Sequence, residues 1–267
     1  MRTPTADRDQ APGKAPLPRH LLILRVVGLT SLAAAFALGG FVAYQLWFTN
    51  IQAAHAQQRL ADEFAVRSQA AEPITGTYQP ESLPLAPIVI PRVLDEAAGL
   101  DTDVITGEEP RPDLILEAPP DLGQPIGRIR IPQADIDWVV VEGVRPSDLT
   151  LGAGHIPGTP LPGQPGTAVI SGHRTTFGAP FRHLDRLVPG DLVTVETTIG
   201  LHTYQVAVVR TVNLDGTWVM SQWQGAWLTL TTCHPPNSAT QRLVVIARLI
   251  DGPNAEAILG AQDRLAG

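Results

Sequence analysis

The sequence predicts an all-β domain that follows one N-terminal transmembrane helix. The run from Val26 to Phe48 contains no charged residue and is long enough, as a helix, to cross a hydrocarbon layer of about 30 Å. From Ile126 to Asp251, short runs rich in β-branched residues alternate with Gly and Pro turns, which is typical of an all-β domain. Prolines and acidic residues predominate between these two regions, so we expect a linker there.

The distribution of positive charge predicts the orientation of the transmembrane helix, residues 26–48. Basic residues are concentrated before the apolar run, whereas residues 49–63 carry one arginine and two acidic residues. Because Lys and Arg favour the cytoplasmic side, we expect residues 1–25 to be cytoplasmic and everything after Asn50 to be extracytoplasmic. The alternative is a cleaved signal peptide ending at the small-x-small pattern Ala54-His55-Ala56, but the apolar part of a signal peptide usually spans about 7–15 residues. We therefore predict a single-pass protein of the cell membrane.

Residues 49–125 are predicted to form an extracytoplasmic stalk and a Pro-rich linker. The stretch 51–71 is rich in Ala and Gln with apolar residues at loose helical spacing, so a short helix is expected to continue out of the membrane until Pro73 ends it. The following stretch, up to Pro125, cannot bury enough apolar surface to offset the entropy of ordering. A sharper hypothesis is that residues 83–91 fold back over the active site as a lid.

Residues 126–251 are predicted to be the functional domain. Its candidate strands are 127–131, 138–142, 166–173, 191–197, 202–212, 227–233 and 242–249. Residues 180–187 predict a short helix instead. So many strands in so few residues favour closure into a small barrel over an open sheet with exposed edges. The tail, residues 252–267, shows no second hydrophobic span.

Composition excludes several classes of function. The net charge of −7 and the pI near 5.4 provide no basic footprint of the kind that nucleic-acid binding needs. A single cysteine rules out an intramolecular disulfide. One cysteine with scattered His and Asp residues shows no close ligand spacing, so no metal site is expected.

The single cysteine, Cys233, is the candidate nucleophile. Alternation along the strand 227–233 divides its side chains between two faces, with Leu228, Leu230 and Thr232 on one and Cys233, Thr231 and Thr229 on the other. A lone cysteine is often a small buried hydrophobe, which is the alternative here. The strand's end, the polar face and the following Pro235-Pro236 turn favour an exposed, reactive thiol instead.

A thiol that is mostly protonated at neutral pH needs a basic neighbour, and histidines can supply it. The histidines of the domain are His155, His173, His183, His202 and His234. An extended backbone turns His234 to the face opposite Cys233, so adjacency counts against it. His173 ends a predicted strand just before a loop, where a side chain is rigid yet faces solvent. It is therefore the preferred partner.

Attack on an amide carbonyl also needs a donor for the developing oxyanion, which a fixed guanidinium can provide. Arg242 starts the strand after the Cys233 loop, so a hairpin would bring it close to the thiol. Arg248 would lie at that strand's far end, and Arg210 is a third candidate. The alternative for Arg242 is a surface arginine at a strand edge.

Substrate-binding residues are predicted on and beside the strand that carries the nucleophile. Thr231 shares the face of Cys233, and the long connection 213–226 contains Trp218 and Trp223, which suit the apolar part of a peptide. Local packing is an equally good explanation for the two tryptophans.

These motifs together resemble the sortase family. The resemblance is carried by Thr229-Leu230-Thr231-Thr232-Cys233, by Arg242 after it and by Gly172-His173-Arg174 before it, in that order and spacing. It extends through residues 126–132 and 154–159, and so covers nearly all of 126–251. The run 172–181 and the His-Pro after the cysteine look most like class E, the group common in actinobacteria, although Phe177 stands where tyrosine is expected.

The resemblance implies an eight-stranded sortase β-barrel that cuts a C-terminal sorting signal, LPXTG-like or LAXTG-like, between Thr and Gly. Carried onto this chain, Cys233 is the nucleophile, His173 the general acid and base, and Arg242 the donor to the substrate or oxyanion. The implied partners are secreted proteins bearing the sorting signal, and the amine of a peptidoglycan precursor or a pilin lysine. No cofactor is expected, and calcium stimulation stays open. His155 matches a recurring family position without an assigned role.

Other functions stay open beside this one. A pilin-polymerising sortase would use the same residues as one that anchors proteins to the wall. A surface cysteine peptidase would release its acyl group to water. A catalytically silent, membrane-tethered scaffold domain would use none of this chemistry.

Overall fold

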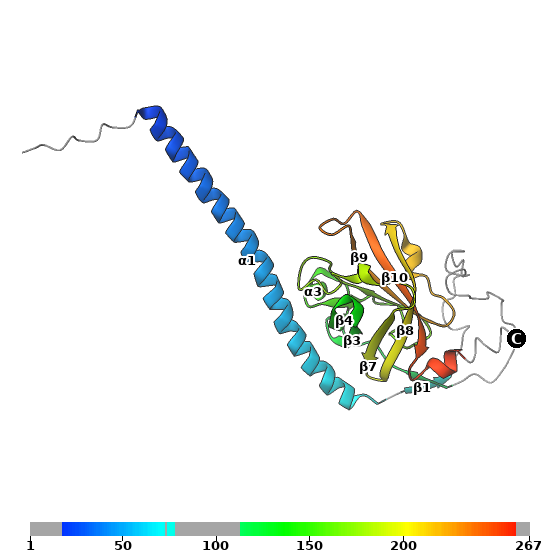
Figure 1. Ribbon diagram of the computed structural model, residues 1–267. Coiled ribbons are helices and arrows are strands. Elements are labelled where there is room, and N and C mark those ends of the chain that lie inside the picture. The colour runs from blue at the N-terminus through cyan, green and yellow to red at the C-terminus, as the bar shows by residue number, and fades with distance from the viewer. Residues whose placement is uncertain (1–17, 73, 78–112, 260–267) are drawn as a thin grey trace, which may run out of the picture. The chain divides into compact units, whose positions relative to one another are not determined.

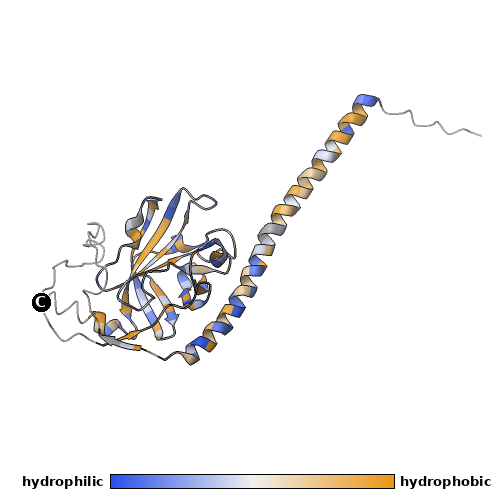
Figure 2. Cartoon of the chain, turned by 180° about the vertical axis from the view of Figure 1, so that it is seen from behind, coloured by the Kyte–Doolittle hydropathy of each residue, from blue (hydrophilic) through white to orange (hydrophobic). Residues whose placement is uncertain are grey.

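The computed structural model describes residues 18–72, 74–77 and 113–259 (Figure 1). Helix α1 (Arg19–Ala70) begins the described chain, and it is long and apolar enough to cross a membrane by length and composition, with a mean hydropathy of 2.2 over its most apolar part. Figure 2 shows that apolar residues predominate in its N-terminal part and polar residues in its C-terminal part. The candidate membrane segment and the predicted stalk helix are therefore one continuous helix.

The C-terminal part of α1 belongs to the same compact unit as the β-domain, which comprises residues 46–267. Its buried side chains recur at helical spacing, at Ala53, Ala56, Leu60 and Phe64. Leu60 packs in a cluster with apolar residues of the neighbouring strand β4 (Ile136–Glu142). This stretch, predicted as a stalk, thus forms one wall of the folded domain.

The domain is a closed barrel of eight strands, and it confirms the predicted fold class (Figure 1). In chain order the strands are β3 (Pro125–Ile131), β4, β5 (Ala153–His155), β6 (Gly166–Ser171), β7 (Leu192–Thr197), β8 (Gly200–Asn213), β9 (Ala226–His234) and β10 (Gln241–Asp251). Around the barrel the order is β10-β8-β7-β3-β4-β5-β6-β9, and closure leaves no open sheet edge. Neighbours are antiparallel except the β4–β5 and β6–β9 pairs.

Side chains that point inward at alternate positions along the strands fill the barrel interior. Leu228 and Leu230 of β9 and Leu243 and Val245 of β10 lie in one buried core cluster. Intervening residues form a second apolar cluster, in which Trp227, Val244 and Ile246 pack with Val208, Val219 and Trp223. The short helical elements connect the strands: η2 (Pro132–Ala134), α3 (Pro146–Leu149), η3 (Leu184–Arg186) and η4 (Thr217–Met220).

All seven predicted strands are present, and three details differ from the prediction. Strand β6 ends at Ser171, so His173 lies two residues beyond it. Strand β5 was not predicted, because three residues are too few to show a period of two. The helix predicted over 180–187 is reduced to the short turn η3.

A small antiparallel sheet lies at the two ends of the predicted linker. It joins β1 (Ile74–Thr77) to β2 (Asp113–Leu116), and Asn254 binds the backbone of Ile115 through both its amide atoms. Ile258, in the predicted tail, lies in a helical turn and is buried in the barrel core, so this part of the tail belongs to the fold. The proposed lid, residues 83–91, lies outside the described residues.

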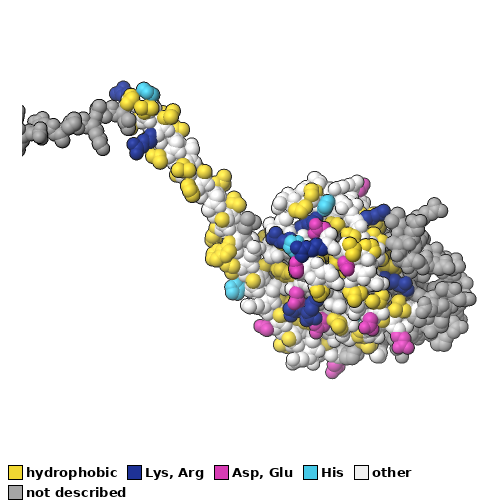
Figure 3. All heavy atoms as spheres, viewed as in Figure 1, with side chains coloured by type: hydrophobic (Ala, Val, Ile, Leu, Met, Phe, Trp, Pro, Cys, Tyr) yellow, Lys and Arg dark blue, Asp and Glu magenta, His cyan; other side chains and the backbone are white. Residues whose placement is uncertain are grey.

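Charges of both signs are interspersed on the face of the barrel shown in Figure 3. Arg128 pairs with Asp137 on neighbouring strands, and Arg130 pairs with Glu196. The mixture of signs on the face in view is unlike the continuous basic surface that nucleic-acid binding needs.

Candidate active site

Three adjacent strands, β6, β9 and β10, bring the predicted catalytic residues together on the outer face of the barrel. Arg242 is the register partner of Cys233 across the antiparallel β9–β10 pair. Ser171 is the partner of Thr231 across the parallel β6–β9 pair. Because neighbouring strands lie about 4.8 Å apart and register partners point to the same face, the ends of these strands form one row.

Cys233 lies at the centre of this row, on the predicted face. Leu228, Leu230 and Thr232 point inward and are buried, whereas Cys233 is partly exposed and carries a free thiol. The predicted alternation holds at the end of the strand, where Thr231 and Cys233 are partly exposed, whereas Thr229, predicted on the same face, is fully buried. The thiol is accessible to a substrate that approaches the outside of the barrel.

His173 follows β6 and continues its pairing with β9. Gly172 donates its backbone N–H to the carbonyl of Thr231 at 3.1 Å, and the Thr232 hydroxyl donates to the carbonyl of Gly172 at 2.7 Å. One residue further, His173 stands level with Cys233. The Phe177 ring lies against the imidazole, with centroids 5.2 Å apart and planes 36° apart.

Partial burial lowers the pKa of His173 below its ordinary value, because an apolar environment disfavours the charged imidazolium. At neutral pH the ring is therefore mostly neutral, which suits a base that accepts a proton from a thiol or an amine. Only the thiolate form of a cysteine acts as a nucleophile.

Arg242 is partly buried beside the thiol. Its Nη1 donates to the carbonyl oxygens of Ala239 (3.2 Å) and Gln241 (3.1 Å), which orients the guanidinium within the β9–β10 loop. These two carbonyls are its hydrogen-bond acceptors within the described part of the chain. A guanidinium has five N–H donors, so others are left for a ligand.

The alternative candidates do not lie in this row. His155 is fully buried, and its two ring nitrogens contact Glu142 (2.6 Å) and Thr159 (2.9 Å), a structural network inside the fold. His202 is also fully buried, and burial lowers its pKa to about 4. Arg248 lies toward the other end of β10, as predicted.

One participant was missed. Arg174, named in the sequence motif without a role, is nearly fully buried behind the thiol. It contacts the carbonyl of Cys233, the imidazole of His234 and the carboxylate of Asp185. Sequence position alone places His234 away from Cys233 but says nothing of this contact. The available signal in the sequence was an arginine directly after a candidate catalytic histidine.

The predicted substrate residues divide into two groups. Thr231 lies on the outer face two residues before Cys233 and is partly exposed. Trp223 is only 2% exposed and packs edge-on against Trp227, with centroids 5.5 Å apart, so its ring offers little surface to a peptide. This burial favours the alternative of local packing for Trp223, whose ring packs in an apolar cluster with Trp227, Val244 and Ile246.

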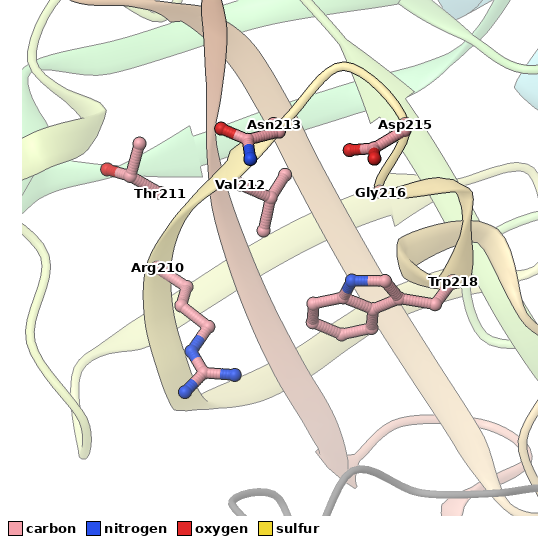
Figure 4. Close-up of a pocket in the computed structure, with 7 residues that line it drawn as sticks. All are labelled: Arg210, Thr211, Val212, Asn213, Asp215, Gly216 and Trp218. Carbon is pink, nitrogen blue, oxygen red and sulfur yellow. The ribbon is translucent and has the colours of Figure 1, made fainter.

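Trp218 remains partly exposed and lines a hollow of about 520 Å³ (Figure 4). The hollow is formed by the end of β8 and the segment after it, with Arg210, Val212 and Asp215 among its lining residues. Val212 is the register partner of Arg242, so the hollow adjoins the row on the side away from His173.

Comparison with known proteins gives consistent results. The model of the sortase domain family matches residues 129–250. Sortase D of Bacillus subtilis is 31% identical over 135 residues, which cover 49% of this chain and 67% of that protein. Sortase SrtE1 of Streptomyces coelicolor is 26% identical over 266 residues, covering 91% of this chain and 60% of that protein, so the chain spans less than two thirds of this relative. The structure of the Clostridium perfringens Sortase D5 transpeptidase has a TM-score of 0.51 at 22% identity, covering 74% of this chain and 99% of that one, which shows a common fold.

Proposed function

Since this chain belongs to the sortase family, we propose that it is a membrane-anchored cysteine transpeptidase. It would cleave an LPXTG-like or LAXTG-like C-terminal sorting signal between Thr and Gly and transfer the acyl group to an amine of a cell-wall precursor. The observation that carries the proposal is the row formed by Cys233 on β9, Arg242 on β10 and His173 just after the end of β6. No cofactor is proposed for this chemistry.

In the acylation step, the Cys233 thiolate attacks the carbonyl carbon of Thr, and its proton resides on His173. The guanidinium of Arg242 donates to the oxygen that becomes negatively charged. The C–N bond then breaks, and the imidazolium protonates the departing amine of Gly. A thioester and a neutral imidazole remain.

In the transfer step, His173 removes a proton from the incoming amine as it attacks the thioester. The new amide forms and the Cys233 thiolate leaves, which restores the starting state. Water must be a poorer competitor than the amine for this outcome, so the site has to bind one nucleophile preferentially.

The proposed topology places the N-terminus in the cytoplasm and the barrel outside. Its support is the candidate membrane helix in α1 together with the basic residues that precede it. Class E is proposed from the motif around His173 and from the match to SrtE1, which extends over 91% of this chain. Wall anchoring and pilin polymerisation would share the site.

Product analysis with the full chain in detergent tests the proposal. A sorting peptide incubated with an added amine should yield the peptide–amine conjugate, and Cys233→Ala should abolish it while the far-UV circular dichroism spectrum stays unchanged. Hydrolysis that no amine diverts would indicate a cysteine peptidase instead. Unchanged cell-surface display of substrates with Cys233→Ala would indicate a scaffold.

A further inference from the structure

The active-site loop, residues 174–180, follows His173 and has a strained backbone. Three successive residues, Phe177, Gly178 and Ala179, have φ angles of 50°, 75° and 50°, in the left-handed region. A β-carbon disfavours this region, so Phe177 and Ala179 adopt it because the contacts around them require it. In this conformation the Phe177 ring lies against the imidazole of His173, with centroids 5.2 Å apart. The shape of the loop therefore determines what lies beside the imidazole.

Two backbone hydrogen bonds hold the loop from within. Ala179 donates its N–H to the carbonyl of Thr176 at 2.8 Å, and Phe181 donates to the carbonyl of His173 at 3.1 Å. These bonds do not use the N–H of Gly178, which lies at the centre of the left-handed run. That N–H therefore needs an acceptor outside the loop.

Helix α1 supplies this acceptor and a packing surface. Asn50 Oδ1 accepts from the Gly178 N–H at 3.0 Å. One turn further along the helix, Ala53 is fully buried. A methyl group on Gly178 would lie 3.3 Å from the Ala53 β-carbon and would clash with the ring of Trp138 on β4. The backbone of Gly178 thus fits between the helix and the barrel without room for a side chain.

The same face of α1 is fixed to the barrel. Residues 50, 53 and 57 are three and four positions apart, which places them on one face of a helix. Gln57 bonds the backbone of Val139 and Leu151. Asn50 lies two residues after the predicted membrane span, 26–48. The part of α1 next to that span therefore joins the barrel wall to the active-site loop.

We propose that Asn50 and Ala53 of α1 are positioning residues of the active site. They hold the active-site loop in its left-handed conformation, and the Phe177 ring then holds the imidazole of His173 in place. The ring also covers one side of the imidazole and so adds to the burial that lowers its pKa. A loop released from α1 would relax, and the ring would move away. The catalytic consequence rests on the proposed function, whereas the effect on the imidazole does not.

Steady-state peptide transfer to an amine, by the full chain in detergent, tests the catalytic consequence. Ala53→Leu should lower kcat by about tenfold or more with little change in KM, because a displaced imidazole impairs the reaction rather than peptide binding. Ala54→Leu is the matched control, since Ala54 is exposed on the same helix, and it should keep the wild-type kcat. Phe177→Ala should reproduce the loss, and Phe177→Tyr, which retains the ring, should not. Asn50→Ala should lower kcat by about threefold, since its hydrogen bond is exposed, and Asn50→Asp, which retains an acceptor oxygen, should stay near the wild type.

Histidine NMR tests the effect on the imidazole without any activity. Each protein also carries Cys233→Ala, so that His173 titrates without its thiol neighbour. The pKa of His173 should lie below its ordinary value of about 6.5 when the loop is native. It should rise toward that value in Phe177→Ala and Ala53→Leu, because water then reaches the ring, and stay unchanged in Ala54→Leu. The other ionisable groups on the neighbouring elements are the same in all these proteins: His55, Arg174, Arg182, His183, Asp185, His234 and Arg242.

The outcomes separate this inference from the proposed function. A lower kcat in Ala53→Leu with an unchanged pKa of His173 would show a merely structural role and refute the positioning role. A wild type that transfers no peptide would refute the proposed function, while the NMR titrations would still decide the positioning role. If Ala53→Leu fails to fold, as judged by far-UV circular dichroism, the pair Asn50→Ala and Asn50→Asp decides. A wild-type kcat and an unchanged pKa of His173 in Asn50→Ala would then overturn the inference.

Discussion

Replacing Gln57 by Ala should destabilise the catalytic domain by about 3 kcal/mol, because its amide completes the barrel where two strands stop pairing. The side-chain nitrogen donates to the carbonyls of Val139 (3.1 Å) and Leu151 (2.9 Å), and the oxygen accepts from Val139 N–H at 2.7 Å. Pairing between β4 and β5 begins one residue later, at Val140. The amide of α1 therefore takes the place of a missing strand partner.

The magnitude follows from these three contacts. Each hydrogen bond contributes roughly 1 kcal/mol net, and the loss is greater where a backbone group is left unsatisfied in a partly buried site. The sum is about 3 kcal/mol, which would lower the urea midpoint by roughly 1–2 M for a domain of this size. Gln57→Glu should be similarly harmful, since an ionised carboxylate would face two carbonyl oxygens without a proton to donate.

Urea unfolding of the full chain in detergent, followed by tryptophan fluorescence, measures the effect. Gln58→Ala is the matched control, because Gln58 is the same residue type on the same helix but is exposed. Its free energy of unfolding should change by no more than about 0.5 kcal/mol. Equal midpoints for the two variants would refute the argument that α1 is a structural part of the domain.

Three further predictions address the core and the site. Burial lowers the pKa of His202 from 6.5 to about 4, so the stability that depends on its neutral ring is present above pH 6.5 and is lost as the pH falls toward 4, by about 3 kcal/mol in all. His202→Gln should make the free energy of unfolding less dependent on pH in this range. An unchanged pH dependence in this variant would contradict the prediction. Gly172→Ala would put a methyl group 2.8 Å from the fully buried ring of Phe181. It should therefore cost about 1–3 kcal/mol of stability and reduce kcat by displacing His173, the adjacent residue. Wild-type stability and kcat in this variant would contradict the packing argument. Asn50→Ala removes the acceptor for the Gly178 N–H at 3.0 Å, so peptide transfer should weaken while the free energy of unfolding changes by less than about 1 kcal/mol. A larger loss of stability with intact transfer would argue against a tether for the active-site loop.

The success of the sequence-based prediction at Cys233 has a local cause. The face on which a strand residue lies is determined by a period of two, so counting back to Leu228 was enough to place the thiol outside the core. The pairing of Arg242 with Cys233 likewise follows from the short loop between β9 and β10, which fixes the register of a hairpin.

The contacts that the sequence did not reveal join residues far apart in the chain. Gln57 bonds Val139 across 82 positions, and Arg174 meets His234 across 60. No local pattern encodes such a meeting, because it depends on how the barrel closes and on what packs against it. The burial of Trp223 was undecidable for the same reason, since an aromatic residue in a long connection can face either a ligand or the core.

By itself, the sequence determined the apolar span, the all-β pattern after Ile126 and the outward face of Cys233, because each depends on composition or on a short period. The motif shared with sortases then singled out His173 and Arg242 by resemblance. Only the tertiary structure decided that the C-terminal part of α1 packs against the barrel and that the buried guanidinium of Arg174 contacts His234. Those features arise from closure of the barrel, which brings together backbone and side-chain groups that the linear order keeps apart.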